Sequence, residues 1–212
     1  MEDSPKNSSE TPQSDAELEH LEKMATDNPD SADAHYNLGL ALARRDEWDK
    51  CMVEFRHALK LRPGLCEARI NLAGALLQRG DYDGAIEESL RALQYRPDLA
   101  EGCVTIGIAF TYKGMMNEAI ESFEKALKIN PNFVTAHINL GNAFLALGDL
   151  DKSFKHNAKA VELEPRFGMG HNNLAVTLYQ KGDLEQARKH AREAMLLGYP
   201  VHPDFLKNLG QE

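Results

Sequence analysis

The sequence predicts an all-α repeat array, an α-solenoid, and two observations support this. Proline recurs at intervals of 34 residues, at Pro29, Pro63, Pro97, Pro131 and Pro165. Between successive prolines, two stretches with apolar residues at helical spacing flank a short turn, so each period holds two helices. A period of this length indicates stacked helix pairs that bury their apolar faces against one another.

The net charge argues against some kinds of binding partner, and the cysteines indicate the cellular compartment. The chain has 24 basic and 33 acidic residues, a net charge of -9, which opposes binding to nucleic acid or an anionic membrane surface. No run of residues is long and apolar enough to span a membrane, and residues 1–14 do not resemble a secretion signal. Cys51, Cys66 and Cys103 lack metal or disulfide spacing, so a reducing compartment, most simply the cytoplasm, is expected.

The two ends of the chain differ from the repeats. Residues 1–13 have low hydrophobicity and no period, which predicts a disordered tail. Residues 14–31 are expected to form an N-terminal capping helix and residues 201–212 a C-terminal capping helix, with Pro203 near its first turn. The apolar faces of these helices would be Leu18, Leu21 and Met24 in the first and Phe205, Leu206 and Leu209 in the last.

Five repeats lie between these ends, at residues 32–65, 66–99, 100–133, 134–167 and 168–200. A large residue beside a very small one, at places 7 and 8 of each repeat, lets a neighbouring helix approach closely. These pairs are Leu38-Gly39, Leu72-Ala73, Ile106-Gly107, Leu140-Gly141 and Leu174-Ala175.

A glycine marks the turn between the two helices of four repeats, at Gly80, Gly114, Gly148 and Gly182. Glycine adopts the left-handed conformation that ends a helix, and a following Asp can begin the next one. The first repeat has Arg45-Asp46-Glu47 at this corner. If the left-handed geometry is retained there, a residue other than glycine costs about 1 kcal/mol.

The repeat unit resembles the tetratricopeptide repeat. The resemblance rests on the residues at places 7, 8 and 11, the small residues at places 20 and 27, and proline at place 32, and it covers residues 32 to 200. It implies a right-handed superhelix of antiparallel helix pairs whose first helices line a concave groove. Proteins of this family typically bind peptides or partner proteins in that groove and seldom perform catalysis.

The resemblance also implies which residues would line the groove. Place 6 carries asparagine in four of five repeats, and carboxamides on successive repeats can bond the backbone of an extended peptide. The alternative is that these asparagines tie neighbouring repeats together, and Thr105 interrupts the series. The predicted groove residues are Tyr36, Asn37, Leu40, Ile70, Asn71, Val104, Thr105, Ile108, Tyr112, Ile138, Asn139, Asn142, Asn172, Asn173, Val176 and Tyr179.

The apolar character of this lining favours a partner segment with apolar side chains, either extended or helical. Asp33, Glu67 and Glu101 near one rim would favour a basic flank on that segment. The alternative is that some of the apolar side chains pack between the first helices. Family members that hold acidic chaperone tails use Lys, Asn and Arg at places where this chain has Tyr36, Leu40, Asn71, Glu101 and Thr105, so that ligand is not expected.

No catalytic or cofactor motif is present in the sequence, so no enzyme activity and no cofactor are expected. Histidine recurs at place 4 (His35, His137, His171) and place 23 (His156, His190), following the repeat. Equivalent histidines of neighbouring repeats would lie about 10 Å apart, by common helix spacing, too far to share a metal ion. No metal site is therefore predicted.

The sequence thus predicts a non-catalytic module that binds a peptide or partner protein in the groove. The alternative is a self-assembling scaffold, or an assembly factor of a larger complex, that associates through its terminal helices as a homo-oligomer. The partner's identity does not follow from the sequence.

Overall fold

A computed structural model describes residues 12–210, and all regular structure within this range is helical. The chain divides into two compact units, Met1–Pro97 and Asp98–Glu212, called here the N-terminal and C-terminal units. The N-terminal unit contains α1 (Pro12–Asp27), α2 (Ala32–Arg44), α3 (Trp48–Leu61), α4 (Cys66–Gln78) and α5 (Tyr82–Tyr95). The C-terminal unit contains α6 (Ala100–Tyr112), α7 (Met116–Ile129), α8 (Val134–Ala146), α9 (Leu150–Leu163), α10 (Gly168–Gln180), α11 (Leu184–Leu196) and α12 (Pro203–Asn208).

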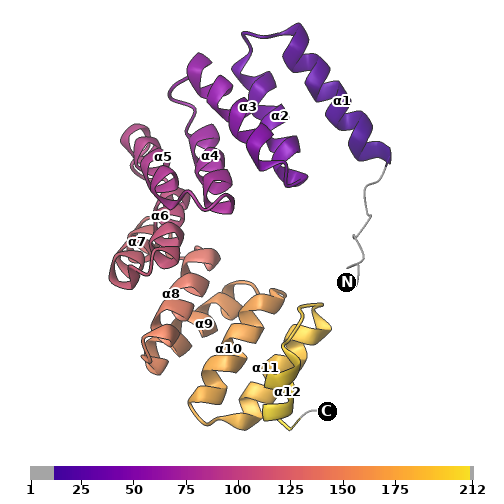
Figure 1. The fold of residues 1–212 in the computed structure, drawn as a ribbon. Coiled ribbons are helices and arrows are strands. Elements are labelled where there is room, and N and C mark those ends of the chain that lie inside the picture. The colour runs from indigo at the N-terminus through magenta and orange to yellow at the C-terminus, as the bar shows by residue number, and fades with distance from the viewer. Residues whose placement is uncertain (1–11, 211–212) are drawn as a thin grey trace. The chain divides into compact units, whose positions relative to one another are not determined.

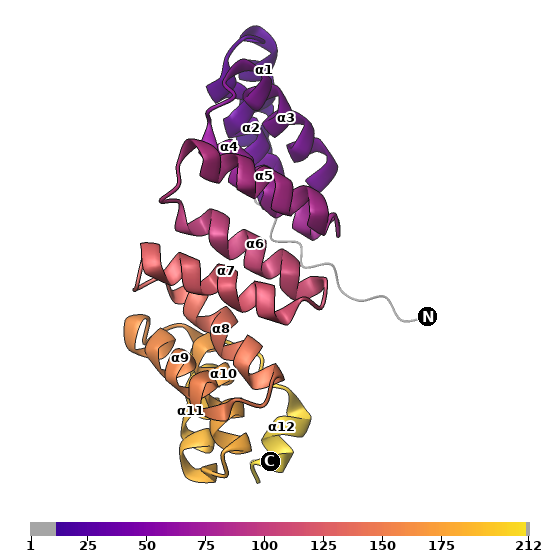
Figure 2. The same ribbon diagram turned by 90° about the vertical axis from the view of Figure 1, so that its left-hand side faces the viewer.

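The repeat boundaries predicted from the sequence coincide with the helix starts. The first helix of each repeat begins at Ala32, Cys66, Ala100, Val134 or Gly168. Within each unit, consecutive helices form antiparallel pairs, and each pair packs on the next, as α3 does on α4 and α7 on α8 (Figures 1 and 2). The fold is therefore the predicted array of stacked helix pairs.

The turns between paired helices have the predicted left-handed residue. Gly80, Gly114, Gly148 and Gly182 have φ between 74° and 84°, and Asp46 takes the same corner in the first repeat with φ 58°. The aspartates that follow three of these glycines cap the next helix. Their side chains accept hydrogen bonds from backbone amides, Asp81 from Gly84, Asp149 from Lys152 and Asp183 from Gln186.

Close packing within each repeat joins place 8 of the first helix to place 24 of the second. A Cβ added to Gly107 would lie 2.4 Å from the Phe123 ring, and one added to Gly39 would lie 2.6 Å from the Phe55 ring. Where place 8 is alanine, place 24 is small, as at Ser89. The side chains at places 8 and 24 therefore fill one space between the two helices, and a large side chain at place 24 requires glycine at place 8.

The terminal helices pack onto the repeats next to them. α1 begins at Pro12, two residues before the predicted start, and Leu18 and Leu21 pack against the core of the N-terminal unit. At the other end, Phe205, Leu206 and the fully buried Leu209 belong to the apolar cluster of α10 and α11. Of the predicted disordered tail, residues 1–11 lie outside the described part of the chain, as do residues 211 and 212.

Cys51, Cys66 and Cys103 are buried free thiols. Among the helices of the described residues, none combines the length and apolarity needed to cross a bilayer.

Candidate functional site

In the N-terminal unit, the predicted groove residues lie on α2 and α4, which contact each other. Tyr36, Leu40, Ile70 and Asn71 are half-buried, and Asn37 is exposed. The Asn71 side-chain amide donates to the Tyr36 hydroxyl at 3.1 Å, from one repeat to the next. Burial raises the pKa of Tyr36, and this hydrogen bond opposes the shift. At this position the asparagine ties neighbouring repeats together, which is the structural alternative to peptide binding.

The acidic rim of this unit is already paired with arginine. Both oxygens of Asp33 accept hydrogen bonds from Arg62, at 2.8 and 2.9 Å, and Glu67 accepts one from Arg96 at 2.9 Å. The hydrogen bond from Arg62 lowers the pKa of Asp33. Because each arginine belongs to the same repeat as its acid, these two acids attract a basic partner less than the sequence suggested.

In the C-terminal unit, the predicted groove residues lie on α6, α8 and α10, and each of these helices contacts the next. Val104, Thr105 and Ile138 are buried, so they offer little surface to a partner. Tyr112 and Asn142 are exposed. The half-exposed members of the set are Ile108, Asn139, Asn172, Asn173, Val176 and Tyr179.

The place 6 side chains of the C-terminal unit do not form a uniform series. Thr105 donates to the carbonyl of Glu101 at 2.9 Å, and the amide of Asn139 donates to the carbonyl of Thr135 at 2.8 Å, each within its own helix. The Asn173 side-chain nitrogen is buried without a hydrogen-bond partner among the described residues. The structure therefore gives these side chains different local roles.

Tyr179 is the predicted groove residue nearest the end of the array. Its ring meets the Phe205 ring of α12 edge to face, with centroids 5.6 Å apart. The terminal helix therefore covers part of the surface that the sequence assigned to the groove.

A second feature recurs within the repeats and joins place 4 of the first helix to place 23 of the second. In three repeats His35, His137 and His171 at place 4 have Nε2 within 2.9 to 3.1 Å of a proline carbonyl six residues earlier. In another, Arg69 donates to the equivalent carbonyl of Pro63 and pairs with Glu88 at 2.8 Å. The proline that ends one repeat thus anchors the next.

In the last two repeats the place 4 and place 23 histidines pair with each other, and both ring nitrogens of the place 4 histidine have a hydrogen-bond partner. Nδ1 of His137 lies 3.0 Å from Nδ1 of His156, and the corresponding atoms of His171 and His190 are 2.9 Å apart. A carbonyl only accepts, so Nε2 of the place 4 ring carries the proton and its Nδ1 accepts from the partner. Burial lowers the pKa of His137 and of His190 and, with the nearby His137, lowers that of His156 to about 4.

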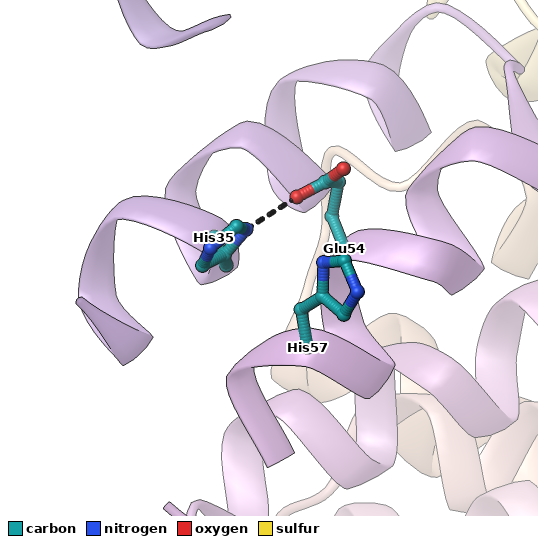
Figure 3. Close-up of side chains that lie close together, drawn as sticks. All are labelled: His35, Glu54 and His57. Carbon is teal, nitrogen blue, oxygen red and sulfur yellow. Dashed lines mark hydrogen bonds and ion pairs between the residues drawn. The ribbon is translucent and has the colours of Figure 1, made fainter. Parts of the chain in front are cut away.

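The first repeat combines the place 4 histidine with a carboxylate and a further histidine. His35 Nδ1 lies 2.6 Å from Glu54 Oε2, and His57, one turn along α3 from Glu54, brings a ring nitrogen into the same group (Figure 3). One nitrogen or oxygen of each side chain lies within 4.8 Å of the others. His35 is buried, Glu54 half-buried and His57 exposed.

The sequence prediction did not include these pairs, although a signal for them was present. Histidines at places 4 and 23 are 19 residues apart within one repeat, and an Arg and a Glu share this spacing in the second repeat. The prediction compared histidines only between neighbouring repeats. In antiparallel paired helices the contact is instead made between the two helices of one repeat.

Comparisons with known proteins agree with the observed architecture. Five family models described as TPR or tetratricopeptide repeat match residues 32–65, 54–100, 107–148, 134–167 and 172–204. No curated protein sequence shows a significant match to the chain.

Solved structures with the same fold share little sequence identity with the chain. A thermophilic TPR protein of Thermus thermophilus is 22% identical, with a TM-score of 0.70, over 85% of this chain and 97% of that one. YrrB, a TPR protein with an unusual peptide-binding site, is 19% identical, with a TM-score of 0.59, over 85% and 93%. The APC/C Cut9–Hcn1 structure is 19% identical, with a TM-score of 0.82, over 93% of this chain and 40% of that one.

Proposed function

The chain belongs to the tetratricopeptide repeat family, and on that premise we propose that it is a non-catalytic module that binds a peptide or partner protein. The proposed binding surface in the C-terminal unit is the face of α6, α8 and α10. The observation that supports it is the mixture of accessible apolar and amide side chains on that face, including Ile108, Asn142 and Val176.

The chemistry of this face suits a segment with apolar side chains, either extended or helical. Ile108 and Val176 can bury apolar groups of the partner, and each fully buried aliphatic side chain contributes about 1.5 to 3 kcal/mol. The carboxamide of Asn142 offers both a donor and an acceptor to a peptide backbone. Because only part of the face is apolar, the polar groups would fix the orientation of the bound segment.

The experiment selects peptides that bind the whole chain from a displayed library and measures their affinity for variants. Asn142→Lys places a charge on the proposed surface at an exposed position, and Lys128→Glu changes a charge on the second helix α7 as a control. We expect at least a tenfold loss of affinity for the first variant and little change for the second. Equal effects of the two substitutions would refute this surface as the binding face.

The place 6 asparagines are tested separately. Replacing Asn71 by Ala removes the hydrogen bond to Tyr36, and replacing Asn139 by Ala removes a bond within α8. If these asparagines bind ligand, peptide affinity falls in the variants by more than their loss of thermal stability explains. Unchanged affinity with lowered stability would assign them a structural role only.

Self-assembly through the terminal helices receives less support from the structure. Leu18 and Leu21 pack into the N-terminal unit, and Phe205 and Leu209 pack into the C-terminal unit. Part of the apolar surface that could join two copies is thereby used within one chain, whereas Met24 of the predicted N-terminal face is exposed. Sedimentation at high concentration distinguishes the two functions, since a self-assembling scaffold would form larger species.

A further inference from the structure

We propose that His35, Glu54 and His57 bind one divalent transition-metal ion, with Zn²⁺ as the representative ion. The proposal rests on the hydrogen bond that orients His35, on the convergence of three ligand groups and on the contrast with the other repeats. It departs from the sequence-based expectation that the chain has no metal site.

The hydrogen bonds of His35 leave a lone pair facing a carboxylate. Its Nε2 lies 3.1 Å from the carbonyl oxygen of Pro29, which only accepts, so this nitrogen carries a proton. In the neutral ring, Nδ1 then has a lone pair directed at Glu54 Oε2, only 2.6 Å away. Two bare acceptors would repel each other at this distance, so a proton or a metal ion must lie between them.

The same hydrogen bond prepares His35 to bind a metal. Histidines that bind metals usually donate their other ring N–H to a carbonyl or carboxylate, which fixes the tautomer and the ring orientation. The Pro29 carbonyl provides this support, and the buried position of His35 limits movement of its ring. The first ligand is therefore oriented by the fold before any ion binds.

His57 supplies a third ligand close to the first two. Its ring lies edge to face with that of His35, with centroids 5.1 Å apart (Figure 3). Ligands about 2.1 Å from a tetrahedral ion are about 3.4 Å apart. The ligand atoms here lie within 4.8 Å of one another, so binding needs a closure of at most about 1.4 Å. The exposed His57 side chain can make this movement.

The other repeats lack this combination of groups. At place 26, where the first repeat has His57, they have Arg91, Lys125, Lys159 and Glu193. In the second, fourth and fifth repeats the place 4 and place 23 side chains also pair without an ion, as Arg69 with Glu88 or as two histidines. The third repeat has Cys103 and Ser122 at these places. Among the described residues, the first repeat supplies a cluster of two histidines and a carboxylate around one point.

The site opens onto a hollow between α1, α2 and α3. Its lining includes Glu22 and Thr26 of α1, together with the three proposed ligands. Lys50 also lines it, but its ammonium group is paired with Glu47 at 2.5 Å, which reduces repulsion of a cation. With three protein ligands, an ion would keep a coordination position for water or another ligand from this side.

The ligand types determine the class of ion. Two imidazoles and one carboxylate suit Zn²⁺ and the neighbouring first-row ions, whereas Mg²⁺ and Ca²⁺ prefer oxygen ligands alone. The ligand cluster contains no cysteine, so no thiolate is expected among the ligands. A magnesium or calcium salt should therefore not compete with zinc.

The experiment measures Zn²⁺ binding to the metal-free full chain by calorimetry. His57→Arg and His35→Arg remove one ligand each and introduce the residues of the second repeat, where Arg91 and Arg69 each pair with Glu88. We expect one saturable site in the wild type and at least a tenfold weaker affinity in each variant. The exposed position of His57 makes its variant informative even if His35→Arg fails to fold.

A matched control alters the fourth repeat in the same manner. The double variant His137→Arg and His156→Glu also copies the second-repeat pair, and it should bind Zn²⁺ as the wild type does. Co²⁺ bound in place of zinc should show visible absorption without a thiolate charge-transfer band. Absence of a saturable site, unchanged affinity in His57→Arg, loss of binding in the fourth-repeat variant, or a thiolate band would each overturn the proposal.

Discussion

The contact between Gly107 and Phe123 predicts that adding one methyl group will destabilise the C-terminal unit. The Cβ of alanine at position 107 would lie 2.4, 2.6 and 2.8 Å from three ring carbons of Phe123, which is itself fully buried. Overpacking of this kind costs about 1 to 3 kcal/mol. In the opposite direction, alanine in place of glycine inside a helix stabilises the helix by about 0.5 to 1 kcal/mol. We therefore expect Gly107→Ala to lower the free energy of unfolding, by up to about 2.5 kcal/mol.

Gly74 provides a matched control, because an added Cβ there meets no atom within 4 Å. Gly74→Ala should raise the free energy of unfolding by about 0.5 to 1 kcal/mol. Denaturant unfolding followed by circular dichroism measures both variants. In a Phe123→Ala background the methyl at position 107 should become stabilising, since Ala175 and Ala191 already form such a pair. The reasoning is refuted if Gly107→Ala stabilises the wild type as Gly74→Ala does.

Three further perturbations test single features of the fold. Asp46→Gly should raise the free energy of unfolding by about 1 kcal/mol, because Asp46 holds φ 58°, and denaturant midpoints measure this. Thr177→Val should lower it by about 1 to 3 kcal/mol in the same assay, because buried Ser153 and Asn157 lose their bonds to the hydroxyl. His156 has its pKa lowered from 6.5 to about 4, mainly by burial, so the unfolded chain binds a proton that the folded chain does not between these pH values. Stability should thus fall as pH falls through this window, and His156→Gln should reduce the fall in midpoints measured at pH 7 and 4.5.

The elements predicted correctly from the sequence are those that depend on local chemistry. Helix starts follow from the proline period, and the left-handed turns follow from glycine at a fixed place. Even the departure at Asp46 was predictable, because the next repeats show which geometry that corner must have. Repetition helped here, since each repeat provides an independent example of the same turn.

The candidate site was less predictable because exposure and pairing depend on the second helix and on neighbouring repeats. Val104 and Ile138 occupy the same place as the half-exposed Ile70 and Asn172, yet they are buried. Place in the repeat therefore assigns a residue to a face of the helix but does not determine how neighbouring helices cover it.

Besides ending a helix, four of the five repeating prolines have a backbone carbonyl that accepts a hydrogen bond from the side chain at place 4 of the next repeat. The carbonyls of Pro29, Pro63, Pro131 and Pro165 each face the place 4 side chain of the next repeat. A histidine at that place must present its proton to the carbonyl, so its other nitrogen accepts, and place 23 must then donate.

A second histidine at place 23 meets this requirement as a neutral donor, as His156 and His190 do. An acid at place 23 suits an arginine at place 4, as in the pair of Glu88 and Arg69. Glu54 breaks this correspondence, because it is an acid opposite a histidine. The contact in the first repeat therefore requires either a proton or a metal ion between the two groups. His57 lies beside this pair and would supply a third ligand to a metal ion, whereas a shared proton has no use for it.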